Sequence, residues 1–130
     1  MLLTGILETA LYVRDLDRSR DFYQALFEFE LLGSSDRLIA LAVSAGQVLL
    51  LCKQGASSAL PHTAHDGDGQ LHVAFAIPAA ALAAWEARLA ERGVPVVESR
   101  TWEKGGRSVY FRDPDGHLVE LATPGVWTNY

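Results

Sequence analysis

Three polar side chains interrupt segments of the chain that are otherwise apolar. Glu8 lies within "GILETALYV", His72 within "LHVAFAI" and Glu120 within "HLVELAT". A charged group in such a segment is costly to bury unless another group or a metal ion pairs with it. One neutral imidazole and two carboxylates would offset most of the charge of a divalent cation and leave positions for water and substrate. The alternatives are an arginine partner for Glu8, a satisfied core position for His72, or a hydrogen-bonded polar cluster without metal.

The helices and strands that must position these residues form an internal repeat. Each half of the chain is expected to contain a strand, a helix and about three further strands. In the first half they are expected over residues 6–13, 16–27 (with Asp15 as N-cap), 37–43 and 47–53. In the second half they are expected over residues 71–77, 79–93, 94–99, 107–113 and 117–123. Segment 54–70, rich in Gly, Ser and Asp, is expected to be a linker. The sequence therefore predicts one α+β domain, 1–130, built from two βαβββ modules, 1–53 and 71–130.

The two modules can be laid over each other, and the overlay aligns the polar residues. Glu8 falls on His72, and the segment from Arg37 aligns without gaps on the segment from Arg107, so that Leu50 falls on Glu120. Three of these four corresponding positions hold residue types that bind metals. If the two sheets face each other around a pseudo-twofold axis, we expect the three side chains to converge on one point.

Two stretches carry a resemblance to a known family. "LYVRDLDRSRDFYQALF" and "VYFRDPDGHLVEL" resemble the first strand and helix, and the last hairpin, of the vicinal oxygen chelate superfamily. That superfamily includes glyoxalase I, fosfomycin-resistance thiol transferases, extradiol dioxygenases and metal-free bleomycin-binding proteins. The resemblance implies two βαβββ modules that form a cupped, incomplete barrel around one divalent metal ion. By position it makes Glu8, His72 and Glu120 the ligands, and it places Leu50 where glyoxalases have a fourth, acidic ligand.

Two departures from the family pattern bear on the chemistry. The first ligand position commonly holds His, and a carboxylate there shifts preference toward Mn, Mg or Fe(II), although Zn and Ni remain open. Leu50 argues against a true glyoxalase I. The glyoxalase resemblance also implies that one carboxylate, Glu120 or Glu8, loosens from the ion and acts as catalytic base.

The segment "TWEKGGRSVYF" supplies candidate substrate-binding residues. Its two glycines permit a tight loop, after which an aromatic wall, a cation and two hydroxyls could contact a substrate: Trp102, Arg107, Ser108 and Tyr110. In the fosfomycin-resistance transferases a Ser and a Tyr at similar spacing contact the phosphonate, so the resemblance favours the last two. Tyr12, on the strand face of Glu8, is a further candidate. The alternative is a hairpin with a solvated arginine and a core tyrosine.

Other conspicuous residues are expected to be structural. His62 and His65 lie in the linker with no rigid element to hold them, and His117 is a turn residue after "DPDG". Cys52 is expected to be a small buried hydrophobe. The stripe Leu82, Trp85 and Leu89 is expected to face the core.

The leading functional hypothesis is a metal-dependent enzyme, a lyase or isomerase, dioxygenase or thiol transferase, that acts on a small oxygen-rich substrate. The alternative is a metal-free binding protein of the bleomycin-resistance type, which sequesters an antibiotic or metabolite. The chain has eleven basic and sixteen acidic residues, which gives a net charge of −5. This charge argues against nucleic acid or membranes as partners. "MLLTGIL" lacks the features of a secretion signal, so a cytoplasmic location is expected. The family resemblance implies a homodimer.

Overall fold

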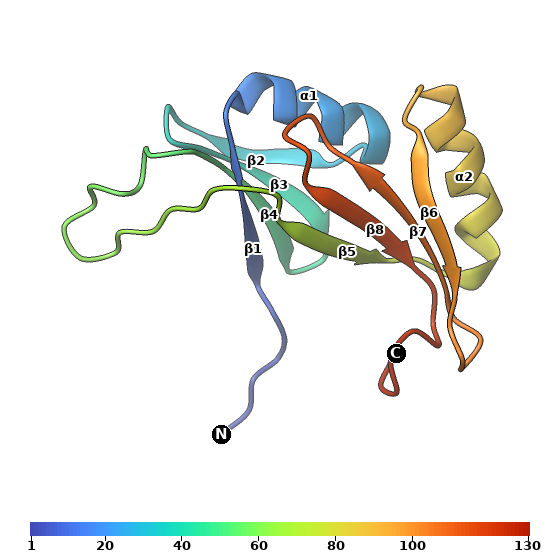
Figure 1. The fold of residues 1–130 in the computed structure, drawn as a ribbon. Helices are drawn as coiled ribbons and strands as arrows, with labels where there is room; N and C mark the ends of the chain where they lie inside the picture. The colour runs from blue at the N-terminus through green and yellow to red at the C-terminus, as the bar shows by residue number, and fades with distance from the viewer. The chain divides into compact units, whose positions relative to one another are not determined.

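The computed structural model describes residues 1–130, which form two compact units, Met1–Gly69 and Gln70–Tyr130 (Figure 1). The first unit contains β1 (Glu8–Val13), α1 (Leu16–Phe27), β2 (Glu30–Ser34), β3 (Leu38–Ser44) and β4 (Gln47–Lys53). The second contains β5 (His72–Ala76), a short 3₁₀ helix η1 (Ala79–Ala81), α2 (Leu82–Glu91), β6 (Val96–Thr101), β7 (Arg107–Arg112) and β8 (Leu118–Ala122). The α+β class and the two βαβββ modules are confirmed.

The two four-stranded sheets have the same topology. The strand orders are β1-β4-β3-β2 and β5-β8-β7-β6, so the first and last strands of each unit are parallel neighbours. The registers agree as well, because Ala10 lies opposite Leu50 in the first unit and Ala74 lies opposite Glu120 in the second. The gapless overlay of the two modules therefore holds at the level of strand register.

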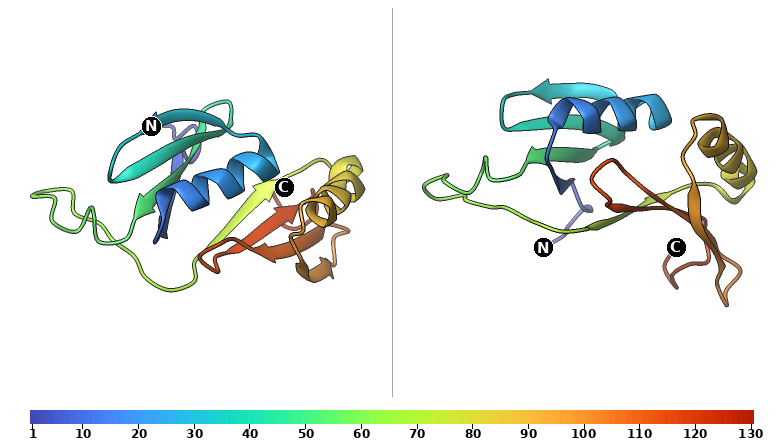
Figure 2. Two further views of the ribbon diagram at one scale, coloured as in Figure 1. Left: turned by 90° about the horizontal axis from the view of Figure 1, so that it is seen from above. Right: turned by 45° about the horizontal axis from the view of Figure 1, so that its top comes forward.

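Alternation along the strands divides each sheet into a core face and an open face. Figure 2 shows α1 along one face of the first sheet and α2 along one face of the second. In the inner strands of both units every second residue faces the helix and is buried with it, while the residues between them form the open face. In β7 and β8 the open-face residues Ser108, Tyr110 and Glu120 are buried as well. The buried set is Leu11, Val13, Ile39, Leu41, Leu49 and Leu51 with Tyr23 and Leu26 of α1, and Val109, Phe111, Val119 and Leu121 with Leu82 and Leu89 of α2.

Local signals account for the ends of the helices. Asp15 caps α1, since its Oδ1 accepts a hydrogen bond from the backbone N–H of Arg18 at 3.0 Å. Gly93, with φ +67°, follows α2, a conformation that glycine adopts without strain. Trp85 of the predicted core stripe is half-buried. Neither helix is long and apolar enough to cross a membrane.

Three differences from the sequence prediction concern exposed segments. β1 begins two residues later than predicted, and Ile6 and Leu7 before it are exposed. The sequence does not predict β2. All five residues of this strand are exposed, and they show no alternation of apolar and polar side chains. β6 is shifted by two residues toward the C-terminus, which places Arg100 inside the strand.

Candidate functional site

The open face of the second sheet brings His72 and Glu120 together. His72 begins β5 and Glu120 lies in β8, the strand paired with it. Nε2 of His72 is 3.2 Å from Oε2 of Glu120, and the two side chains are 50% and 8% exposed. The half-exposed imidazole thus meets a nearly buried carboxylate.

The hydrogen-bond partner of Nδ1 determines the tautomer of His72. Nδ1 is 3.0 Å from the carbonyl oxygen of Leu118, which can only accept a hydrogen bond, so Nδ1 carries a proton. In the neutral ring, Nε2 then directs a lone pair toward the Glu120 carboxylate. Two acceptors this close repel each other unless a proton or a cation lies near both of them. A backbone carbonyl that orients the ring of a metal-binding histidine in this way is typical of metal sites.

The second carboxylate oxygen of Glu120 also indicates that a proton or a cation is needed here. Oε1 is buried and has no hydrogen-bond partner. An unpaired, buried carboxylate oxygen is costly, and a bound cation would compensate that cost. The donor chemistry of His72 and Glu120 therefore fits a divalent metal ion.

The predicted third ligand lies in the other unit. Glu8 is the first residue of β1, and its side chain is exposed. Neither unit by itself gathers three His, Cys, Asp or Glu side chains around a single point. The role of Glu8 as a ligand stays a prediction.

An aromatic and cationic wall adjoins His72 and Glu120 on the open face. Tyr110 of β7 lies opposite Glu120, and its ring centroid is 6.5 Å from that of His72. The indole Nε1–H of Trp102 donates a hydrogen bond to Oγ of the buried Ser108 at 2.8 Å. Burial is the largest effect on the Tyr110 hydroxyl and raises its pKa. A hydrogen bond with Ser108 lowers this pKa in part, Glu120 raises it and Arg100 lowers it; the net shift is upward, so the phenol keeps its proton.

The cation of this wall is Arg100, which sequence reasoning missed. Its Cζ lies 5.1 Å from the ring centroid of Trp102 and 5.5 Å from that of Tyr110. Arg107, the predicted cation, is adjacent to Ser108 in β7, so strand alternation directs it away from the open face. Arg100 could be identified from the pairing of β6 with β7, because this pairing sets it opposite Ser108, a predicted site residue.

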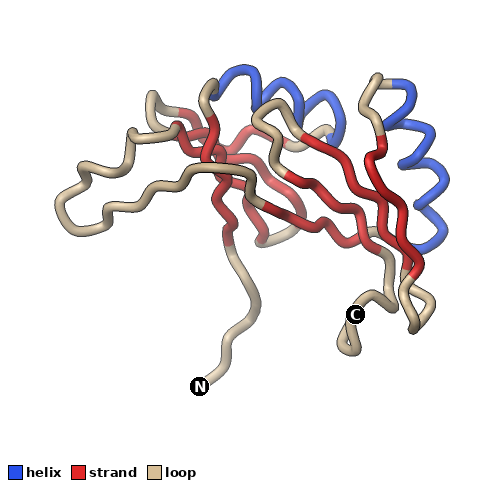
Figure 3. The backbone as a smooth tube through the Cα atoms, viewed as in Figure 1, coloured by secondary structure: helices blue, strands red, loops and turns tan.

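A long loop without helix or strand connects β4 and β5 (Figure 3). Tyr12 of β1 contacts His65 of this loop. Its hydroxyl is 2.7 Å from Nδ1 of His65. Burial, with Cys52 and Asp66, raises the pKa of Tyr12, so the phenol keeps its proton and donates a hydrogen bond to this nitrogen. A side chain at Gly67 would come within 2.4 Å of the Tyr12 ring. A substrate-binding role for Tyr12 stays a prediction, since its ring and hydroxyl already contact this loop.

The loop is more ordered than the sequence suggested. It contains no helix or strand, as predicted, but Oδ1 of Asp66 accepts a hydrogen bond from the backbone N–H of Gly55 at 3.0 Å and closes it. Arg37 donates to the hydroxyl of the buried Ser57 at 2.8 Å. The interpretation that nothing rigid holds His65 was wrong, because Tyr12 on β1 holds it. Compact loops with closed ends are a recognised class.

Tyr12→Phe is expected to loosen the loop. Loss of one partly buried hydrogen bond should lower the free energy of unfolding by about 1 kcal/mol. Hydrogen exchange at the backbone amides of Gly55 and His65 should become faster, because the Tyr12 contact no longer restrains the loop. Tyr130→Phe removes a hydrogen-bonded hydroxyl from the second unit instead and is the matched control, which should leave exchange at Gly55 and His65 unchanged. Unchanged exchange in the Tyr12 variant would show that the loop does not depend on this bond.

The remaining predicted structural residues agree with their interpretations. His117 is buried, and its Nδ1 accepts a hydrogen bond from the backbone N–H of Leu71 at 2.9 Å, which ties the turn before β8 to the start of β5. Cys52 is buried, and burial raises the pKa of its thiol. His62 is exposed.

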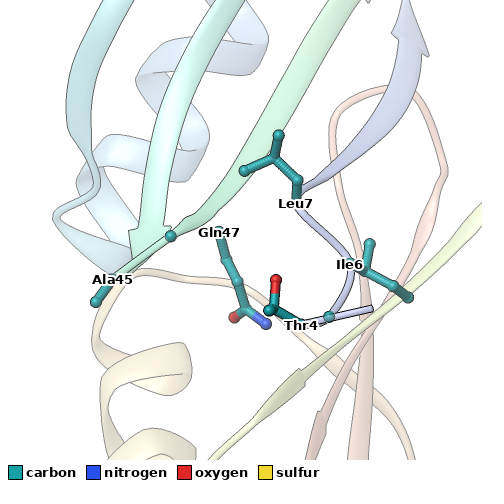
Figure 4. Close-up of a pocket in the computed structure, with 7 residues that line it drawn as sticks. Thr4, Ile6, Leu7, Ala45 and Gln47 are labelled. Carbon is teal, nitrogen blue, oxygen red and sulfur yellow. The ribbon is translucent and has the colours of Figure 1, made fainter. Parts of the chain in front are cut away.

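A hollow in the first unit lies where the chain enters β1 (Figure 4). It is lined by Thr4, Gly5, Ile6, Leu7, Ala45, Gly46 and Gln47. These side chains are apolar apart from one hydroxyl and one amide. The hollow contains no titratable group, and none of the predicted site residues lines it.

Comparison with known proteins extends over nearly the whole chain. The sequence model of a family described as "Glyoxalase/Bleomycin resistance protein/Dioxygenase superfamily" matches residues 5–121. The metallothiol transferase FosB of Bacillus licheniformis is 31% identical over 126 residues, which are 96% of this chain and 79% of that protein.

Two solved structures are also similar. The lactoylglutathione lyase from Agrobacterium tumefaciens is 32% identical with a TM-score of 0.91, and the match covers 97% of this chain and 98% of that one. A variant of the fosfomycin resistance protein FosX from Listeria monocytogenes, complexed with Mn(II) and 1S,2S-dihydroxypropylphosphonic acid, is 28% identical with a TM-score of 0.68. That match covers 92% of this chain and 90% of the variant.

Proposed function

The chain belongs to the glyoxalase/bleomycin resistance protein/dioxygenase superfamily, and we propose that it is a metal-dependent enzyme acting on a small oxygen-rich substrate. The observation that carries the proposal is the pairing of His72 with Glu120, in which a lone pair faces a carboxylate whose other oxygen is buried without a partner. A similar protein, the FosX variant, was solved with Mn(II) and an oxygen-rich ligand.

In this proposal His72 and Glu120 hold a divalent ion, and Glu8 supplies the third ligand from the first unit or from a second copy of the chain. Two carboxylates and one imidazole form a hard donor set, which favours Mn, Mg or Fe(II). The ion, when bound, would draw in two neighbouring oxygens of the substrate and stabilise negative charge that develops on them. We also propose that the protein is a cytoplasmic homodimer.

The residues of the wall would bind the rest of the substrate. Tyr110 keeps its proton and can donate to a substrate oxygen, and Arg100 can bind an anionic or carbonyl group. Trp102 and Ser108 complete this side of the site. Glu120 or Glu8 would accept the proton that the reaction removes. Leu50, at the place of the fourth glyoxalase ligand, favours a reaction other than that of glyoxalase I.

A metal-free binding protein is the second candidate, and Glu120 argues against it. A binder that had lost its metal would gain stability by replacing a buried carboxylate that has an unpaired oxygen, because burying an unsatisfied charged group is costly. Bleomycin-resistance members of the family show that the fold supports such a function, so direct measurement of metal decides between the two.

Protein purified without chelator is expected to contain about one divalent metal ion per chain, as measured by elemental analysis. EDTA should lower the melting temperature, since an ion that binds only the folded state at a hundred times its Kd stabilises it by about 2.7 kcal/mol. Added Mn(II) should restore the original value. Absence of bound metal, together with a melting temperature that neither EDTA nor Mn(II) changes, would favour the metal-free binding protein.

A further inference from the structure

Glu98 and Arg100 lie two residues apart on β6 and therefore on the same face of the second sheet. The strand pairing sets Glu98 opposite Tyr110 and Arg100 opposite Ser108, so both adjoin the wall of the candidate site. We propose that Glu98 neutralises the Arg100 anchor, so that the site accepts a neutral or singly charged oxygen-bearing ligand, such as a hydroxycarboxylate or a diol, without favouring a dianion such as phosphate or a phosphonate. The inference rests on the function proposed above and narrows its substrate class.

The contacts of Arg100 show how the pairing operates. Nη2 donates to both carboxylate oxygens of Glu98, at 3.0 and 3.2 Å. The guanidinium also lies over the rings of Trp102 and Tyr110. The hydrogen-bond donors of a guanidinium lie at the edge of its plane, so a ligand must reach that edge. Glu98 lies at that edge.

The charges give the preference its direction. Arg100 and Glu98 together carry no net charge, so the attraction of the guanidinium for an approaching anion is opposed by the neighbouring carboxylate. Because this energy scales with the ligand's charge, Glu98 opposes a dianion twice as strongly as a monoanion. The two side chains are 46% and 54% exposed, so solvent and salt weaken the effect to a few-fold in affinity.

The test is a titration of the protein, supplied with Mg(II), at an alkaline pH at which inorganic phosphate is mainly the dianion. Glycolate is the singly charged probe and phosphate is the dianionic probe. The indole N–H signal of Trp102 reports binding by NMR, since this group lies beside Arg100 and bonds to Ser108. The unchanged protein should bind the two probes with similar affinity. Glu98→Gln should tighten glycolate about threefold and phosphate about tenfold, the second factor being roughly the square of the first.

Two variants make the comparison specific. Glu98→Asp keeps the charge and should keep the original ratio of affinities. Glu103→Gln removes an exposed charge from the loop after β6, where solvent and salt screen it, and should leave both affinities and their ratio nearly unchanged. The proposal is overturned if the unchanged protein binds phosphate more than about tenfold tighter than glycolate, if Glu98→Gln leaves the ratio unaltered, or if neither probe shifts the Trp102 signal. Because that signal does not require a bound metal, elemental analysis of the same samples tests the proposed function separately.

Discussion

Glu120→Gln is expected to weaken divalent metal binding at least about a hundredfold while leaving the metal-free protein as stable as before, or more stable. The loss follows because an amide replaces a charged ligand, and substitutions even one step removed from a metal typically cost ten- to a hundredfold in affinity. The stability follows because Oε1 of Glu120 is buried without a partner, and a neutral amide is cheaper to bury there than a carboxylate.

The sign of the stability change separates two roles for this carboxylate. If Glu120 served only as an ion-pair partner of His72, the substitution would remove a favourable contact and lower the melting temperature of the metal-free protein. Mn(II) affinity by calorimetry and unfolding in the presence of EDTA measure the two effects independently. Glu103→Gln makes the same chemical change at an exposed loop position and should alter neither quantity. Undiminished Mn(II) affinity in Glu120→Gln would remove this residue from the metal site.

The repeat is the part of the structure that the sequence predicted best. Alternation in strands is a short-range pattern, and two modules that share it also share a register, so the sequence alone matches the Glu120 position to Leu50. The pairing of His72 with Glu120 follows from the same register. The matched register also exposes a chemical difference: the first open face has the apolar Leu50 where the second has the carboxylate of Glu120.

What the sequence did not predict depends on contacts between segments far apart in the chain. Arg100 was missed because the end of an exposed edge strand has no apolar alternation, and only its pairing with β7 places it over Tyr110. The order of the loop after β4 depends on Tyr12 and His65, which are 53 residues apart. Composition alone describes such a segment as a linker, because side-chain hydrogen bonds leave no periodic signal.

A close contact at the C-terminus also supports the candidate site. The C-terminal segment packs against the loop between β6 and β7 at Gly106 and Gly125, so closely that a Cβ at Gly106 would lie 2.3 Å from backbone atoms of Gly125 and Val126. Tyr130 secures this segment, since its hydroxyl donates to the carbonyl oxygens of Ile77 and Ala122 at 3.2 and 3.1 Å. The same loop carries Trp102, whose backbone N–H donates to the carbonyl oxygen of Gly106 at 2.7 Å.

Gly106→Ala is therefore expected to destabilise the protein by about 2–3 kcal/mol, the upper part of the usual range for overpacking, because the atoms in the way belong to the backbone. Since the added methyl group meets backbone atoms, either the C-terminal segment or the Trp102 loop must move, and the indole N–H of Trp102 should exchange faster with solvent. Urea unfolding and hydrogen exchange measure the two effects. Gly33→Ala in β2 is the matched control, because nothing lies within 4 Å of the added atom and the substitution should be neutral or slightly stabilising. A Gly106 variant as stable as this control, with unaltered exchange at Trp102, would mean that the C-terminal segment does not position the wall of the site.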